Sequence, residues 1–117
     1  MSVKFVAVGD IGPDRDDPAT IFDAVRDRLK MADLGFCQLE VNLTSRGQRL
    51  PQARHTIRGR CEIANALVET NLELVSFAGN HCLDWGHEGL LDTLDALESA
   101  GAVQVGTGAN ISAARAP

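Results

Sequence analysis

Apolar runs and segments of helical periodicity alternate along this chain. Four short runs, at 3–8, 34–39, 74–77 and 102–105, are typical of β-strands. The first run is rich in β-branched residues and predicts a strand that is covered on both faces. Loop chemistry rich in Gly, Pro and Asp follows it, which predicts an early end to that strand.

The segments after these strands carry apolar residues at spacings of three and four, which predicts one helix after each strand. Asp17 and Pro18 form a favourable N-cap and first helical residue for the first of them. Asn71 and Gly101 suit the left-handed conformation that often ends a helix. We expect the four helices at about 18–30, 62–70, 90–100 and 110–115.

This β-α order, repeated four times, predicts an α/β fold with a mainly parallel sheet and right-handed crossovers. No internal domain boundary is evident, so residues 1–117 are expected to belong to one domain. The same four units would also fit half of a (β/α)₈ barrel. A long polar connection spans 40–60, and a connection of that length is usually functional or mobile.

Composition excludes several classes of protein. The formal net charge is −5 and no basic stripe is present, which argues against nucleic-acid binding. No run approaches the roughly 18 apolar residues that span a bilayer, and no secretory signal is visible, so we expect a cytoplasmic protein. Three cysteines without Cys-x-x-Cys spacing indicate free thiols in a reducing compartment: Cys37, Cys61 and Cys82.

The most unusual stretch is 78–89, between the third strand and its helix. It holds two histidines, two carboxylates, an asparagine and three glycines, a mixture that hydrophobic burial does not require. In open α/β sheets, ligands bind outside the carboxyl ends of the strands. The stretch is therefore a candidate site. The alternative is an ordinary helix-start loop, in which Asp84 caps the helix and the glycines serve the turn.

Other polar residues follow the earlier strands. Asp10 comes just past the first strand, Glu40 just past the second, and Asn80, His81 and Asp84 just past the third. Taken alone, each could be a loop residue. Because parallel strands open on one edge, these side chains are expected to meet in one cleft, where carboxylate and imidazole groups suit a first-row divalent ion.

The long connection is basic, with Arg54, His55, Arg58 and Arg60. These side chains could hold an anionic substrate or simply lie on a solvated loop. His87 is a weaker candidate, since it stands at a helix start where exposure is expected.

Several motifs resemble the poly-γ-glutamate capsule biosynthesis family (CapA type), a branch of the calcineurin-like metallophosphoesterases. They are Gly9-Asp10-Ile11, Gln38-Leu39-Glu40, Asn80-His81 and the segment 84–94, and the likeness extends through Gly106-Thr-Gly108 to the end of the chain. The resemblance implies an α/β/β/α sandwich with a metal site at strand ends, of which residues 1–117 would be the N-terminal part. Two departures are Gly12, where the superfamily has a histidine ligand, and Gln38 in place of the family's asparagine.

The resemblance also implies roles. A divalent metal ion (Mn, Zn, Fe or Mg) would be held by Asp10, Glu40 and Asn80. His81 would be the general acid or would orient the scissile group. Asp84, His87 and Arg58 are expected either to support these ligands through hydrogen bonds or to contact the substrate.

Two functions follow as hypotheses. One is a metal-dependent hydrolase that acts on a small-molecule or polymeric anionic substrate, either a phosphoester or a bond in a polyglutamate-like polymer. The other is a non-catalytic component that assists polyglutamate synthesis or export. We expect residues 1–117 alone to be an incomplete enzyme with an exposed apolar sheet face and a tendency to self-associate.

Overall fold

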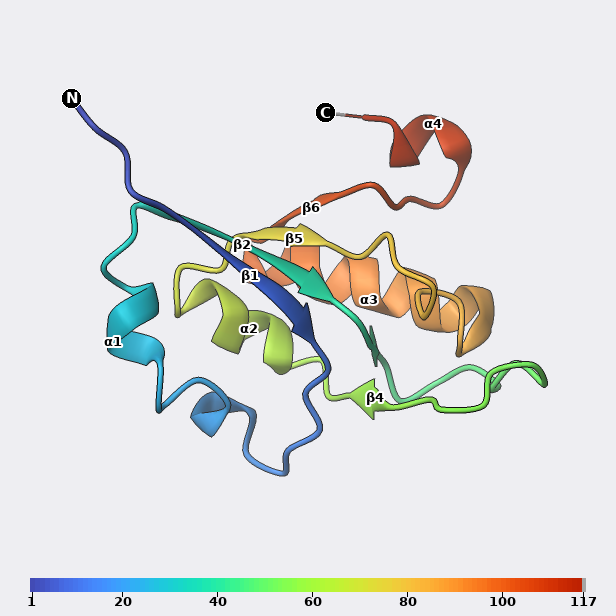
Figure 1. The fold of residues 1–117 in the computed structure, drawn as a ribbon. Helices are drawn as coiled ribbons and strands as arrows, with labels where there is room; N and C mark the ends of the chain where they lie inside the picture. Colours follow the sequence, from blue (N-terminus) through green and yellow to red (C-terminus); the bar gives the residue numbers. More distant parts are fainter. Residues whose placement is uncertain (117) are drawn as a thin grey trace.

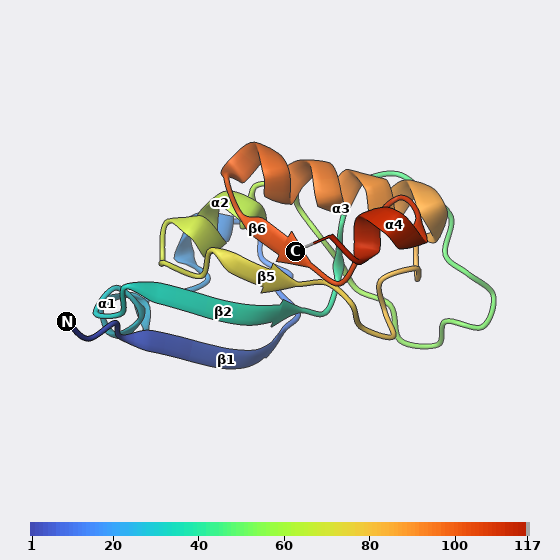
Figure 2. The ribbon, with the colours of Figure 1, turned by 90° about the horizontal axis from the view of Figure 1, so that it is seen from above.

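The chain folds around one parallel sheet. The computed structural model describes residues 1–116. Strands β1 (Phe5–Ile11), β2 (Leu34–Leu39), β5 (Leu74–Ser76) and β6 (Val103–Val105) lie side by side in sequence order, and every pairing is parallel. Their carboxyl ends point to the same side of the molecule (Figure 2). The predicted α/β class and mainly parallel sheet are confirmed, and the arrangement is consistent with half of a layered sandwich.

Helices α2 (Ile63–Val68) and α3 (Gly86–Ala100) pack on the same face of the sheet (Figure 2). Their inward apolar residues form one core with alternate residues of β2 and β5, because strand side chains alternate between faces. The predicted C-cap is confirmed, since Gly101 adopts a left-handed conformation with φ of 86°. Asn71, with φ of 63°, likewise turns the chain after α2. The short helix α4 (Ile111–Ala114) follows β6.

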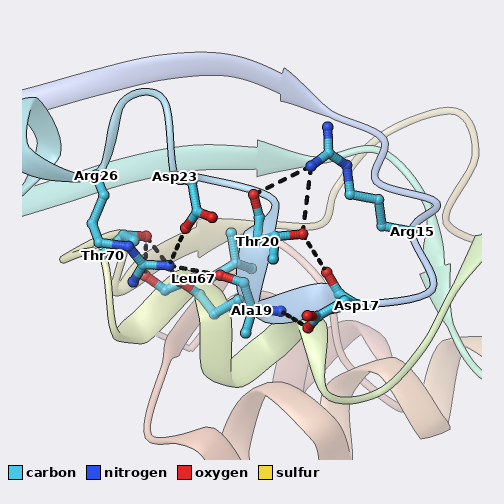
Figure 3. A network of polar contacts seen from close by, with 9 residues as sticks. Arg15, Asp17, Ala19, Thr20, Asp23, Arg26, Leu67 and Thr70 are labelled. Carbon is cyan, nitrogen blue, oxygen red and sulfur yellow. Dashed lines mark hydrogen bonds and ion pairs between the residues drawn. The ribbon is translucent and has the colours of Figure 1, made fainter.

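The predicted first helix is broken. A 3₁₀ turn, η1 (Pro18–Thr20), and a four-residue helix, α1 (Arg26–Leu29), replace it. The Asp17 carboxylate accepts from the Ala19 amide and caps the 3₁₀ turn, as predicted. The Arg26 guanidinium, however, donates to the Ala19 carbonyl, which a continuous α-helix would pair with the Asp23 amide, and to the Asp23 carboxylate (Figure 3). These local bonds compete with the helix ladder, and β-branched residues in the segment weaken its helical preference.

The long connection is more ordered than its sequence suggests. Within it, β3 (Asn42–Leu43) and β4 (Arg58–Gly59) form a two-stranded parallel ladder. Both β3 residues are buried, and the Leu43 amide donates to the Thr93 hydroxyl on α3 at 2.9 Å. The connection is therefore tied at both ends by this ladder, and the segment between β3 and β4 extends beyond it toward the start of α3 (Figure 1).

Strand β1 is not covered on both faces, which corrects that expectation. It is an edge strand, and its outward residues are exposed. Phe5, Leu34 and Val103 are exposed apolar side chains on three strands. In the sheet register Phe5 pairs with Leu34, and Leu74 pairs with Val103, which places these residues on the face opposite the buried core. Among residues 1–116, Phe5, Leu34 and Val103 thus form exposed apolar surface on this face, as predicted.

Candidate functional site

His81 and Asp84 form the centre of the candidate site. A series of tight turns follows β5, in which the Asp84 amide donates to the His81 carbonyl at 3.1 Å. This spacing brings both side chains to one side, where Nδ1 of His81 lies 2.6 Å from Oδ2 of Asp84. Asp84 is buried. The N-cap residue of α3 is Trp85, and no side chain caps the helix, so Asp84 does not serve as the helix cap that an ordinary helix-start loop would require.

Glu40 faces the other ring nitrogen. Its Oε1 lies 3.9 Å from Nε2 of His81, too far for a hydrogen bond but close enough for one small group to bridge them. The Glu40 amide donates to the Ile11 carbonyl at 2.9 Å, which fixes the chain where it leaves β2. His81 therefore stands between two carboxylates. Because a carboxylate only accepts, Nδ1 is assigned as the donor to Asp84, and Nε2 is left to exchange a proton.

These three side chains line a pocket of about 230 Å³, called here the inner pocket. Its remaining wall comes from Gly12, which directly follows β1, and from three residues of the long connection, Val41, His55 and Ile57. A Cβ atom placed on Gly12 would lie 3.5 Å from Oε2 of Glu40. A side chain at this position would thus stand next to Glu40, whereas Gly12 leaves that place open.

A second pocket, of about 550 Å³, adjoins the first and is called the outer pocket. His55, His81 and Asp84 line both pockets, so the two form one groove. Asn80 lines the outer pocket beside His81 and is itself exposed. Of the predicted set, Glu40, Asn80, His81 and Asp84 are therefore brought together.

Asp10 is only partly where it was expected. It lies inside β1 rather than past its end, because the strand continues to Ile11 after an irregularity in register. Its register partner is Gln38, and it is exposed at the carboxyl end of the sheet. It does not line either pocket. Its role as a metal ligand stays a prediction.

Arg58 and His87 lie outside the groove. Arg58 stacks over the Trp85 ring, 4.3 Å from its centroid, and donates to the Ser45 carbonyl. It lines neither pocket, although its strand neighbour Ile57 does, because successive strand residues point in opposite directions. His87 is exposed on the first turn of α3 and lines neither pocket. Their assignment to the substrate or to support of the ligands stays a prediction.

No group of three or more His, Cys, Asp and Glu side chains within 1–116 is arranged to hold an ion. Glu40 shares its pocket with His81, whose Nδ1 is already engaged by Asp84. Metal binding through Asp10, Glu40 and Asn80 remains a prediction.

Asn42, which holds the turn between His81 and Asp84, was not predicted from the sequence as a site residue. Asn42 is fully buried on β3, and its amide donates to the Cys82 carbonyl at 2.9 Å, between His81 and Asp84. A buried asparagine needs such partners, since an unpaired polar group away from water is costly. The signal was a polar residue within an apolar segment, Val41-Asn-Leu43, but only the β3–β4 pairing shows that this segment is interior.

Fold and site together describe an α/β protein with a carboxylate–histidine–carboxylate cluster at the carboxyl ends of parallel strands. The chain matches the family described as "Bacterial capsule synthesis protein PGA_cap" over residues 4–117. It therefore belongs to that family, which confirms the predicted resemblance.

Two curated relatives come from two strains of Mycobacterium tuberculosis, and each is named "Probable polyglutamine synthesis accessory protein". Each is 35% identical over 83 residues, which cover 71% of this chain and 22% of the relative. The chain thus spans well under half of these relatives. Among residues 1–116, no helix has the length and apolar character needed to cross a membrane. The cytoplasmic location stays a prediction.

Proposed function

We propose that this chain carries part of the active site of a hydrolase that acts during capsule or polyglutamate synthesis. The observation that supports this best is His81, whose two ring nitrogens face Asp84 and Glu40 in an accessible pocket. An imidazole that is oriented by a buried carboxylate is the usual arrangement for proton transfer. The substrate class that suits the proposal is anionic, either a small phosphoester or a polymer with carboxylate groups.

In this proposal the Asp84 carboxylate accepts a hydrogen bond from the Nδ1–H of His81 and fixes the ring, so that Nε2 is directed into the inner pocket. Nε2 can then donate a proton to a leaving oxygen or nitrogen, or accept one from an attacking water. Glu40 is close enough to hold a water or leaving group opposite Nε2. The cluster therefore positions a proton at one defined atom, which contributes about 100-fold to 10,000-fold in typical enzymes.

The test uses the intact protein with an activated phosphoester and, separately, an oligomer of γ-linked glutamate. We expect His81→Gln to lower kcat by about 100-fold or more, and Asp84→Asn by about 10-fold to 100-fold, since it acts through the orientation of His81. Asp27→Asn on α1 is the matched control, because Asp27 is exposed and distant from the groove in sequence and fold. Hydrolysis by His81→Gln at the wild-type rate would overturn the proposal.

The predicted metal ion belongs to the same proposal. The intact protein would bind a divalent ion with Glu40, Asp10 and Asn80 among its ligands. Asn80→Ala should then lower the bound metal measured by elemental analysis, whereas Asn80→Asp should retain it because a carboxylate oxygen replaces the amide oxygen. Equal metal content in wild type and Asn80→Ala would remove Asn80 from the ligand set.

A second candidate is a non-catalytic accessory component that binds the polymer or its synthetic machinery. It is favoured by the names of the two relatives. Binding of γ-linked glutamate oligomers without any shortening of the oligomer, measured on the intact protein with and without added divalent metals, would favour this candidate over the hydrolase.

A further inference from the structure

The groove is unevenly charged. The inner pocket carries the Glu40 and Asp84 carboxylates around His81. The outer pocket shares Asp84 with the inner pocket but is also lined by Arg54, Gln52 and Asn80, so it has a permanent positive charge that the inner pocket lacks. His55 lies in both walls, at the junction.

The outer wall is held against the His81 turn by its backbone. The Leu50 amide donates to the Asp84 carbonyl at 2.9 Å, and the Ala53 amide donates back to the Leu50 carbonyl at 3.0 Å. Gly47 has φ of 80°, and any Cβ atom there would collide with the Trp85 carbonyl. The connection therefore rests directly on the turn that follows His81. Arg54 and His55 consequently owe their place in the groove to the same segment that carries the proton-transfer cluster.

Charge then decides where an anionic ligand can lie. Two carboxylates in the inner pocket repel an anion at close range, whereas a guanidinium attracts it and can donate two hydrogen bonds to one oxyanion. A substrate with both a neutral scissile bond and a nearby negative group would place the bond at His81. Its negative group would lie at Arg54.

We propose that the outer pocket is a subsite for an oxyanion of the substrate, a carboxylate or a phosphate, and that Arg54 and His55 determine the specificity for it. This rests on the proposed function, because it names the part of the substrate that lies next to His81. Arg54 supplies the charge, His55 supplies a hydrogen bond at the junction of the pockets, and Gln52 and Asn80 supply amide partners for the adjoining polar atoms.

The experiment measures binding to the intact protein by fluorescence anisotropy. One probe is a labelled oligomer of γ-linked glutamate, and the second is the same oligomer with its free carboxylates converted to amides. Inorganic phosphate and acetate are added in separate arms as competitors, so that the two oxyanion sources are distinguished. Arg54→Gln and His55→Gln are compared with Arg49→Gln, which removes the same charge from the same connection at an exposed residue that lines neither pocket.

We expect Arg54→Gln to weaken binding of the charged oligomer about 10-fold, the usual loss for a hydrogen-bonded ion pair, and to leave the amidated oligomer unchanged. His55→Gln should weaken it several-fold, and Arg49→Gln less than about 2-fold. Stronger displacement by phosphate than by acetate would assign the subsite to phosphate, and the reverse would assign it to carboxylate. Equal losses for Arg54→Gln and Arg49→Gln, or equal losses for both oligomers, would overturn the proposal.

The oxyanion subsite is tested by binding and the hydrolase by turnover, so each can fail while the other holds. In the His81→Gln variant hydrolysis should be lost, while the preference for the charged oligomer over the amidated one, which depends on Arg54, should persist. Arg54-dependent binding in a protein that hydrolyses nothing would support the subsite and contradict the hydrolase.

Discussion

The two faces of the sheet have similar side chains and opposite surroundings. On the face under α2 and α3, Cys37, Leu39, Val75 and Phe77 are all 0% exposed. On the other face, Phe5 is 56% exposed and Val103 58% exposed. Both faces are apolar because the strands are apolar in both alternating positions. Apolar residues along a strand therefore show that a sheet face could be buried. Whether that face is buried depends on which helices pack against it.

The largest expected effect lies on the covered face. Phe77→Ala should lower the free energy of unfolding by about 3–5 kcal/mol, because it removes a buried ring and leaves a cavity. Chemical denaturation followed by circular dichroism would measure this loss. A change below 1 kcal/mol would mean that the face under the helices is not the main source of stability.

A smaller effect is expected where the connection is fastened to α3. Asp92 accepts hydrogen bonds from the Arg46 guanidinium and the Thr44 hydroxyl, and these partners, Arg46 first, hold the pKa of Asp92 below its ordinary value. The resulting stability is present above the unfolded pKa of about 3.9 and is lost as pH falls through the lower, folded pKa. Asp92→Asn should therefore cost about 1 kcal/mol at pH 7, and less in acid. A loss that is the same at pH 7 and pH 2.5 would contradict this assignment.

On the uncovered face the stability effect should be smaller still. Phe5→Ser with Val103→Ser should change the unfolding free energy of the isolated chain by less than about 1 kcal/mol, since exposed substitutions usually fall within 0.5 kcal/mol each. The same double variant should reduce self-association in sedimentation, because large apolar patches promote contacts between molecules. Ala19→Ser with Ala24→Ser serves as the control for added hydroxyls at exposed positions. Undiminished association in the double variant would show that this face does not mediate it.

The smallest perturbation uses the cysteines as reporters. Burial raises the pKa of the Cys37 thiol to about 12, and its side chain is fully buried. Cys61 is exposed, although burial of its sulfur and the nearby Glu62 raise its pKa as well. At pH 8, iodoacetamide should label Cys61 within the native protein and leave Cys37 unlabelled until the protein unfolds. Rapid labelling of Cys37 would mean that the covered face opens readily.

The same comparison explains what the sequence could predict. Apolar periodicity correctly placed the sheet strands and α2 and α3, because these elements are set by burial on one face. It joined η1 and α1 into one helix, because a pattern does not show that the Arg26 side chain takes the Ala19 carbonyl. It also missed the β3–β4 ladder, whose two residues per strand are too few for any periodicity.

For the site, the places of Glu40, Asn80, His81 and Asp84 just after predicted strands indicated that they would lie near one another. In a parallel sheet the carboxyl ends of the strands lie on the same side, and the four residues line one groove. It left His55 as an undecided loop residue, because its place depends on how the connection folds back over the turn. It also grouped Arg58 with the site, whereas the pairing of β4 turns that side chain toward Trp85. The sequence thus predicts which residues follow each strand, but it does not predict the contacts that a long connection makes when it folds back.

The strand order β1-β2-β5-β6 has a consequence for how the molecule can be assembled on the ribosome. Each strand of the four-stranded sheet pairs with the member of that sheet synthesised before it, so the sheet can grow at a single edge as the chain emerges. No strand has to be inserted between two that are already paired, which limits the time during which unpaired edges are available to other chains. Assembly of these four strands can therefore proceed in the same direction as translation, from β1 to β6.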